Sequence, residues 1–138
     1  MAYWLYKSEP DVFSWDDLVK AGKAGTEWTG VRNYTARNHM REMKKGDRGF
    51  YYHTGDEKAV VGIVEVVKEV HPDSTDDSGQ WDCVDIRAVE KLPRPVTLAE
   101  VKADKKLAEM ALVRFGRLSV QPVTEAEWKA VGKMGGLG

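Results

Sequence analysis

The run AVVGIVEVVKEV, residues 59–70, restricts the fold more than any other feature of the sequence. Its β-branched side chains favour an extended backbone, and a run of this length predicts a long strand. DRGFYYH, residues 47–53, precedes it, and the connecting TGDEK has the composition of a hairpin turn. Gly62 predicts a bulge or a close backbone approach. We therefore expect an antiparallel hairpin over residues 47–70.

Three further segments are predicted to be strands. YWLYKSE is rich in aromatic residues and ends at Pro10, WDCVDIRAVEKL alternates apolar and polar residues up to Pro93 and Pro95, and RLSVQPV follows later. Short helices are expected between the strands, because Ser14, Thr97 and Thr124 occupy N-cap positions. A glutamate three residues after each threonine completes a capping box. Another helix is predicted from about Tyr34 to Lys45.

The order of these elements excludes a doubly wound parallel sheet, since strands and helices do not alternate regularly. We expect an α+β fold, a mostly antiparallel β-barrel with short helices packed around it. The chain of 138 residues, 42% of them hydrophobic, suits a single domain over residues 1–138. Its Gly-rich end predicts a flexible tail from about residue 134.

Composition restricts where the protein works. No apolar run approaches the about 20 residues that span a bilayer, so no membrane association is expected. A single cysteine, Cys83, cannot form an internal disulfide, which favours a reducing, cytoplasmic location.

Charge is balanced overall but not locally. With 21 basic and 22 acidic side chains, general affinity for nucleic acid cannot come from net charge. Arg37, Arg41 and Lys44 form a basic stripe on the helix predicted after Tyr34, and such a stripe suits contacts to phosphates. A solvated helix face is the alternative.

Catalytic and metal signatures are missing. His39, His53 and His71 lie far apart and accompany no CxxC or HExxH motif, so no metal site is predicted. No phosphate-binding loop or nucleophile elbow is present, and no cofactor is expected. A non-catalytic protein is therefore favoured over an enzyme.

The stretch WTGVRNYTARNHM, residues 28–40, favours recognition of a flat polar ligand such as a nucleobase. Trp28 offers a ring for stacking, worth about 1–3 kcal/mol per base, and Arg32 and Asn33 offer hydrogen bonds. Trp28 could equally plug one end of a barrel, and Arg32 and Asn33 could form a salt bridge and a helix cap. Tyr34 is a weaker stacking candidate, for which core packing is the favoured alternative.

The motifs KSEP, W-x-GVRNY-x-AR and RLSVQPV, found in order along nearly the whole chain, resemble the EVE domain family. That family includes thymocyte nuclear protein 28-like proteins and bacterial stand-alone members. The resemblance implies a PUA-like pseudobarrel related to YTH, ASCH and PUA domains. It also implies a reader of modified bases, since some members bind 5-methylcytosine.

Carried over by motif, the resemblance implies a pocket with contributions from all three motifs. Its residues would be Ser8, Trp28, Arg32, Asn33, Tyr34, His53, Ser119 and Gln121.

We therefore expect non-catalytic binding of a modified base in nucleic acid, either RNA or single-stranded or flipped DNA. A sensor of a small molecule such as a nucleotide or metabolite, or an enzyme using the same pocket, is the alternative. A protein partner is a third possibility, and the sequence does not determine the oligomeric state.

Overall fold

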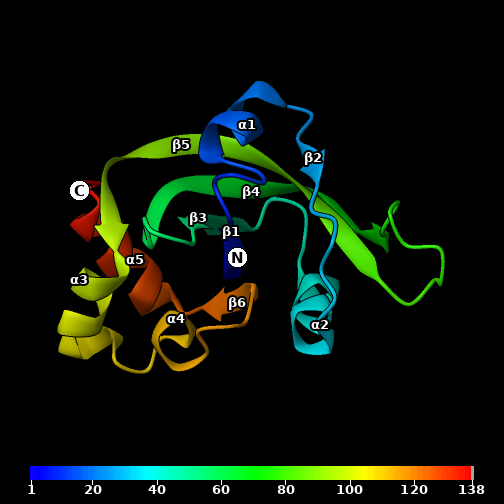
Figure 1. Cartoon of the computed structure of the whole chain (residues 1–138). Coiled ribbons are helices and arrows are strands. Elements are labelled where there is room, and N and C mark those ends of the chain that lie inside the picture. The colour runs from blue at the N-terminus through cyan, green and yellow to red at the C-terminus, as the bar shows by residue number, and fades with distance from the viewer. Residues whose placement is uncertain (138) are drawn as a thin grey trace.

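The long strands β3 (Arg48–His53), β4 (Ala59–Pro72) and β5 (Asp82–Thr97) form an antiparallel meander (Figure 1). The hairpin predicted from the sequence is thereby confirmed. The computed structural model describes residues 1–137. The bulge predicted at Gly62 is confirmed, because the pairing of β4 with β5 shifts between Val60 and Gly62. The close neighbour of Gly62 is the side-chain ring of Trp15 and not a backbone segment.

Three shorter strands complete the sheet, whose order is β2-β5-β4-β3-β1-β6. β1 (Tyr3–Ser8) runs parallel to β3 and antiparallel to β6 (Val120–Val123), while β2 (Thr26–Glu27) pairs with β5. The α+β class and the mostly antiparallel pairing are confirmed. RLSVQPV joins the sheet only from Val120 onward.

The expected closed barrel is wrong, because β2 and β6 remain the edges of the sheet in residues 1–137. β2 has only two residues, too few to carry the sheet around to β6. Helix α2 (Tyr34–Glu42) contacts β6, β5 and β4 instead, so a helix covers the opening that a strand would otherwise close. Figure 1 shows α2 beside β6 and below β2.

The helices begin where the capping signals predict. Ser14, Thr97 and Thr124 cap α1 (Trp15–Lys20), α3 (Leu98–Ala103) and α5 (Glu125–Met134) through complete capping boxes. The short segments α4 and η1 cover Ala111–Arg114 and Lys105–Leu107. α2 ends at Glu42 because Met43 is already extended, before the predicted end at Lys45.

β1 divides the buried side chains between the two faces of the sheet. Trp4 and Tyr6 join the first hydrophobic cluster, together with Trp28 and Tyr51, while Leu5 joins the second. The Tyr6 hydroxyl lies 3.1 Å from the Met43 sulfur, and burial followed by the charge of Asp47 raises the pKa of Tyr6. The hydrogen bond from Tyr6 to Met43 therefore fixes the position of β1 in the core.

β5 continues through Pro93 and Pro95, where the sequence predicted its end. β2 pairs with β5 only at Asp85 and Ile86, so the later part of β5 has a neighbour on one side alone. Proline is tolerated at such an edge because the missing amide would face solvent. The pairing with β4 also shifts there, from Lys91 opposite Gly62 to Val96 opposite Val60.

The described part of the predicted tail is hydrogen bonded to the fold. The amide of Leu137 donates to the Gly132 carbonyl, and Arg94 donates to the Met134 carbonyl. Residue 138 belongs to the same prediction but lies outside the described residues. None of the helices in residues 1–137 has the length and apolar character needed to cross a bilayer.

The contact between Gly62 and Trp15 yields a stability prediction. A Cβ at position 62 would lie 2.5 Å and 2.7 Å from the ring atoms Cη2 and Cε3 of Trp15. We expect Gly62→Ala to lower the free energy of unfolding by about 1–3 kcal/mol, measured by urea denaturation. Gly132→Ala in α5 is the control, since no heavy atom lies within 4 Å of its Cβ. Equal stability of the two variants would contradict the close contact.

Candidate functional site

A cavity of about 440 Å³ opens where β1 ends and the chain passes from β2 toward α2. We call it the β1–β2 cavity. Its volume lies within the range of small-molecule sites, about 300–1,000 Å³. The cavity has both charged and apolar walls, which are formed by Lys7, Ser8, Glu9, Val12, Phe13, Thr26, Glu27, Trp28, Thr29, Gly30, Val31, Arg32 and Ser119.

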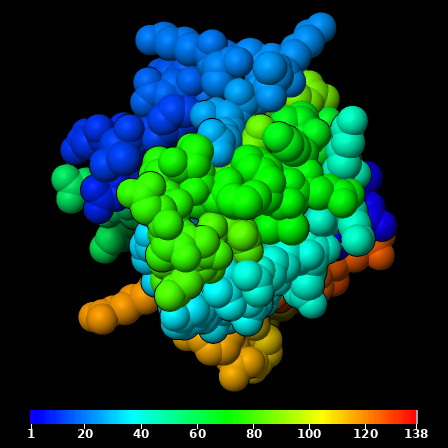
Figure 2. All heavy atoms as spheres, turned by 90° about the vertical axis from the view of Figure 1, so that its right-hand side faces the viewer, coloured from blue at the N-terminus to red at the C-terminus, as the bar shows by residue number. Residues whose placement is uncertain are grey.

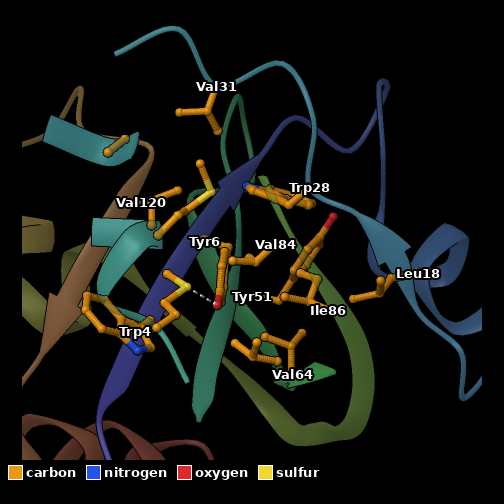
Figure 3. Close-up of a cluster of buried hydrophobic side chains, with 14 of the residues drawn as sticks. Trp4, Tyr6, Leu18, Trp28, Val31, Tyr51, Val64, Val84, Ile86 and Val120 are labelled. Atoms are coloured by element: carbon orange, nitrogen blue, oxygen red, sulfur yellow. Dashed lines mark hydrogen bonds between the residues drawn. The ribbon is translucent and has the colours of Figure 1, made fainter. Parts of the chain in front are cut away.

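Trp28 forms the rigid wall of the β1–β2 cavity. Its amide donates to the Val84 carbonyl at 2.8 Å, and only 8% of the residue is exposed. The rings of Tyr6 and Tyr51 meet the indole edge to face, with centroids 5.8 Å and 5.6 Å away (Figure 3). Trp28 is thus a core residue whose side chain also lines the cavity, and its stacking on a ligand stays a prediction.

Polar groups from the KSEP segment also line the cavity. The Ser8 hydroxyl donates to the Phe13 carbonyl at 2.7 Å, which fixes the turn after β1. The Lys7 ammonium donates to the Gly116 carbonyl, and partial burial lowers the pKa of Lys7. Glu9 is exposed on the lining. The cavity therefore offers donors and acceptors within reach of the same ligand.

The loop after Trp28 is fastened by Asp73, a residue of the β4–β5 loop. The Asp73 carboxylate accepts from the Gly30 amide at 2.9 Å and from the Arg32 guanidinium at 3.2 Å. Burial by itself raises the pKa of Asp73, but hydrogen bonds from Thr75, Gly30 and Arg32 together hold it below its usual range. The charged form of Asp73 therefore holds the Gly30–Arg32 backbone in place.

A second feature lies on the surface beside the cavity, and we call it the stacked surface cluster. Tyr34, 57% exposed, stacks on Trp81 with centroids 4.9 Å apart. The guanidinium of Arg37 lies over Tyr34 at 4.8 Å, and that of Arg32 over Trp81 at 5.7 Å. Figure 2 shows this face, where the green β4–β5 loop lies against the cyan α2. Arg32 belongs to both the cluster and the cavity.

The three residues of the basic stripe differ in their surroundings. Arg37 takes part in the stacked surface cluster and donates to the Gln80 carbonyl. Arg41 forms an ion pair with Asp82 at 2.7 Å, so its charge is largely offset. Lys44 is exposed. The stripe therefore presents less uncompensated charge than its sequence suggests.

Four of the expected pocket residues do not line the β1–β2 cavity. Asn33 caps α2 by accepting from the Ala36 amide, the alternative role recognised in the sequence. Tyr34 is on the surface, so its expected packing in the core is wrong. His53 accepts from the Trp15 amide and contacts Glu57, and the buried Gln121 donates to the Phe115 and Leu118 carbonyls. These hydrogen bonds hold both side chains away from the lining of the β1–β2 cavity.

The sequence did not single out several residues that the fold brings to the site. Lys7 and Glu9 adjoin Ser8, and their place in KSEP was the available signal. Asp73 lies in the β4–β5 loop, and Trp81, predicted as the first residue of a strand, immediately precedes β5; nothing local indicated that they would reach Arg32 and Tyr34.

A larger cavity, about 570 Å³, lies between α2 and β6. Ala111, Phe115, Leu118 and Pro122 give it largely apolar walls. It has fewer groups that could orient a polar ligand, so we regard the β1–β2 cavity as the functional site.

Glu27, His71 and Cys83 form one group of potential metal ligands, with ligand atoms within 4.8 Å of one another. The residues come from β2, β4 and β5, so no local spacing could reveal them. Burial, and next the charge of Glu27, raise the pKa of Cys83 to about 12. Without a cation the thiol therefore keeps its proton near neutral pH.

Comparison with known proteins gives consistent results. The sequence model of the EVE domain matches residues 2–134. Human thymocyte nuclear protein 1 is 35% identical over 94% of this chain and 72% of that protein. A crystal structure of an Agrobacterium tumefaciens protein has a TM-score of 0.97 and 59% identity, covering 99% of this chain and 94% of that one.

Two further solved structures bear on the site and the fold. The human THYN1 protein was crystallised in complex with DNA containing 5-methylcytosine; its TM-score is 0.93 at 35% identity, covering 99% of this chain and 98% of that one. The MmI1 YTH domain has a TM-score of 0.61 at 12% identity, with 97% and 94% coverage, a likeness of fold alone. The expected relation to YTH domains is thereby confirmed for the fold.

The position of Asp73 yields a prediction that depends on pH. Replacing the buried carboxylate by an amide places an NH₂ group among donors, so we expect Asp73→Asn to cost about 1–3 kcal/mol of stability at pH 7. The pKa of Asp73 is lowered in the folded protein, so this contribution is present above the usual value of about 3.9 and is lost as pH falls below it. Urea denaturation between pH 3 and pH 7 measures the difference.

The exposed Asp56→Asn is the matched control for that measurement. Its free energy of unfolding should equal that of the unmodified protein at every pH. A stability difference for Asp73→Asn that stays constant down to pH 3 would contradict a role for the charge of Asp73.

Proposed function

This chain belongs to the EVE domain family, and we propose that it binds a modified nucleobase in nucleic acid without catalysing a reaction. One observation carries the proposal: the β1–β2 cavity has the size of a small-ligand site and a fixed indole wall. A flat ligand can stack there without the cost of ordering a mobile ring. Other hydrogen-bonding groups of the lining, such as Ser8 and Glu9, would read the edge of the base.

We further propose that the base is a modified cytosine in DNA. The human THYN1 protein, whose structure contains DNA with 5-methylcytosine, supports this choice. The lining offers suitable chemistry, since a carboxylate such as Glu9 can accept from the cytosine N4 amino group. Phe13 and Val31 give apolar surface on which a 5-methyl group can lie.

A base inside a duplex must be extruded before it can enter the β1–β2 cavity. Extrusion costs a few kcal/mol, and contacts outside the cavity must offset that cost. The stacked surface cluster lies beside the cavity and shares Arg32 with it. We propose that its arginines contact phosphates and that Tyr34 and Trp81 contact a neighbouring sugar or base. Single-stranded DNA avoids the extrusion cost and should bind more tightly than a duplex.

Replacing Trp28 tests the proposal directly. We expect Trp28→Ala to weaken binding to an oligonucleotide with one 5-methylcytosine by about 5- to 150-fold, which corresponds to about 1–3 kcal/mol of stacking. Fluorescence anisotropy of labelled single-stranded DNA, duplex DNA and RNA, each with and without the methyl group, gives the dissociation constants. Ser119→Leu should also weaken binding, because it fills the cavity and leaves Trp28 in place.

Trp128→Ala is the control for the loss of a packed indole. Trp128 stacks between Tyr3 and Phe50 in the second hydrophobic cluster, away from the cavity, so this variant should bind as the unmodified protein does. Equal affinity for methylated and bare oligonucleotides would contradict recognition of the modification. Equal affinity for free 5-methyldeoxycytidine and for the oligonucleotide would indicate a small-molecule sensor instead.

The basic stripe yields a separate prediction about salt dependence. We expect Lys44→Gln to reduce the slope of log K against log salt concentration by about 0.9 for one phosphate contact in duplex DNA. Arg41→Gln should reduce it less, because Asp82 already offsets that charge. Lys129→Gln on α5 is the control, where no change is expected. Equal slopes for all the proteins would mean that neither Lys44 nor Arg41 contacts a phosphate.

A further inference from the structure

Three different strands bring a thiol, an imidazole and a carboxylate together beside the β1–β2 cavity. The Cys83 sulfur lies 3.6 Å from Oε1 of Glu27 and 3.8 Å from Nδ1 of His71. Cys83 is fully buried, whereas the His71 side chain is 19% exposed, which leaves a path from solvent to the group.

These separations agree with the spacing of ligands around a tetrahedral cation. Zinc binds thiolate sulfur at about 2.3 Å and imidazole nitrogen or carboxylate oxygen at about 2.0–2.1 Å. Tetrahedral angles then place a sulfur ligand about 3.5 Å from each nitrogen or oxygen ligand. The observed distances from Cys83 are therefore within a few tenths of an ångström of a formed site.

His71 is also oriented as a metal ligand would be. Its Nε2 lies 2.7 Å from Oδ1 of Asp85, so Nε2 must carry a proton and donate to that carboxylate. In the neutral ring Nδ1 then holds the lone pair at 3.8 Å from the Cys83 sulfur, and Nε2 lies at a similar distance, 3.7 Å. A carboxylate, histidine and metal in series is the usual arrangement around zinc.

The rival arrangement is a doubly protonated ring. Nδ1 lies 3.2 Å from the Pro72 carbonyl, to which a second ring proton could donate. In that metal-free arrangement the Cys83 thiol donates to Glu27 at 3.6 Å, whereas a bound cation would replace the thiol proton and join Nδ1, Cys83 and Glu27. A measurement of metal uptake by the protein therefore distinguishes the two arrangements.

We propose that Glu27, His71 and Cys83 bind a divalent thiophilic cation, zinc, with Asp85 holding His71 in position. Binding releases the Cys83 proton to solvent, and the thiolate, the neutral imidazole and the carboxylate each donate an electron pair to the cation. Solvent completes the coordination. The proposal is independent of the function proposed for the cavity.

The cation would strengthen the attachment of a short strand. β2 is joined to β5 over only two residues, and Glu27 immediately precedes Trp28. A bond from Glu27 to a cation held by β4 and β5 would tie the Trp28 segment to the centre of the sheet. Zinc should therefore raise the melting temperature of the protein, because it binds the folded state.

The experiment uses the full chain, freed of metal by a chelator and dialysed. Cobalt(II), a spectroscopic substitute for zinc, is added first, and absorption by thiolate-to-cobalt charge transfer reports on Cys83. We expect that absorption to saturate at one cobalt per chain and to disappear when zinc is added. Cys83→Ser should abolish it, and His71→Gln and Glu27→Gln should weaken zinc binding at least tenfold. Asp85→Asn should weaken it by about 10- to 100-fold.

The controls are His39→Gln and Glu125→Gln, which change a histidine and an exposed glutamate elsewhere and should bind zinc as the unmodified protein does. Circular dichroism of each metal-free variant establishes that it is folded. Absence of the charge-transfer absorption in the unmodified protein would overturn the proposal without reference to any variant. Zinc binding that is equal in all variants would overturn it too, since the metal would then bind at other carboxylates.

Discussion

The placement of β1 between β3 and β6 is the constraint on which the site depends. A strand with neighbours on both sides and buried residues on both faces can take one register only, because a shift by one residue would exchange its two faces. That register determines where Lys7, Ser8 and Glu9 leave the sheet. The polar wall of the β1–β2 cavity is thus a direct result of core packing, and the same packing positions Tyr6 beneath Trp28.

The Trp28 wall of the cavity is assembled from segments that are distant in the chain. Trp28 is attached to β5 through the Val84 carbonyl, and the residues that follow it are attached to the β4–β5 loop through Asp73. The polar loop between β4 and β5 is therefore a structural support for the cavity. It also supplies Trp81 to the stacked surface cluster, so one loop connects the interior of the site to the surface beside it.

Local patterns in the sequence were sufficient for most of the fold and part of the site. The β-branched run predicted β4, and the capping boxes at Thr97 and Thr124 predicted two helices, because both depend on neighbouring residues alone. The continuation of β5 through Pro93 could not be predicted, since it depends on which part of β5 lies at an edge. For the same reason the directions of His53 and Gln121, and the contacts of Asp73, depended on the completed fold.

The two end strands of the open sheet are short, and the later part of β5, which has one neighbour, carries Pro93 and Pro95; both features affect how molecules of this protein meet one another. β2 offers two residues, and β6 offers four, one of which is Pro122. An unpaired strand edge is a template for intermolecular pairing, and short edges or edges with proline are poor templates. Of the strands rich in β-branched and aromatic residues, β3 and the Ala59–Glu65 part of β4 are paired on both sides. The sheet thus protects its most aggregation-prone segments by order alone, without closing into a barrel.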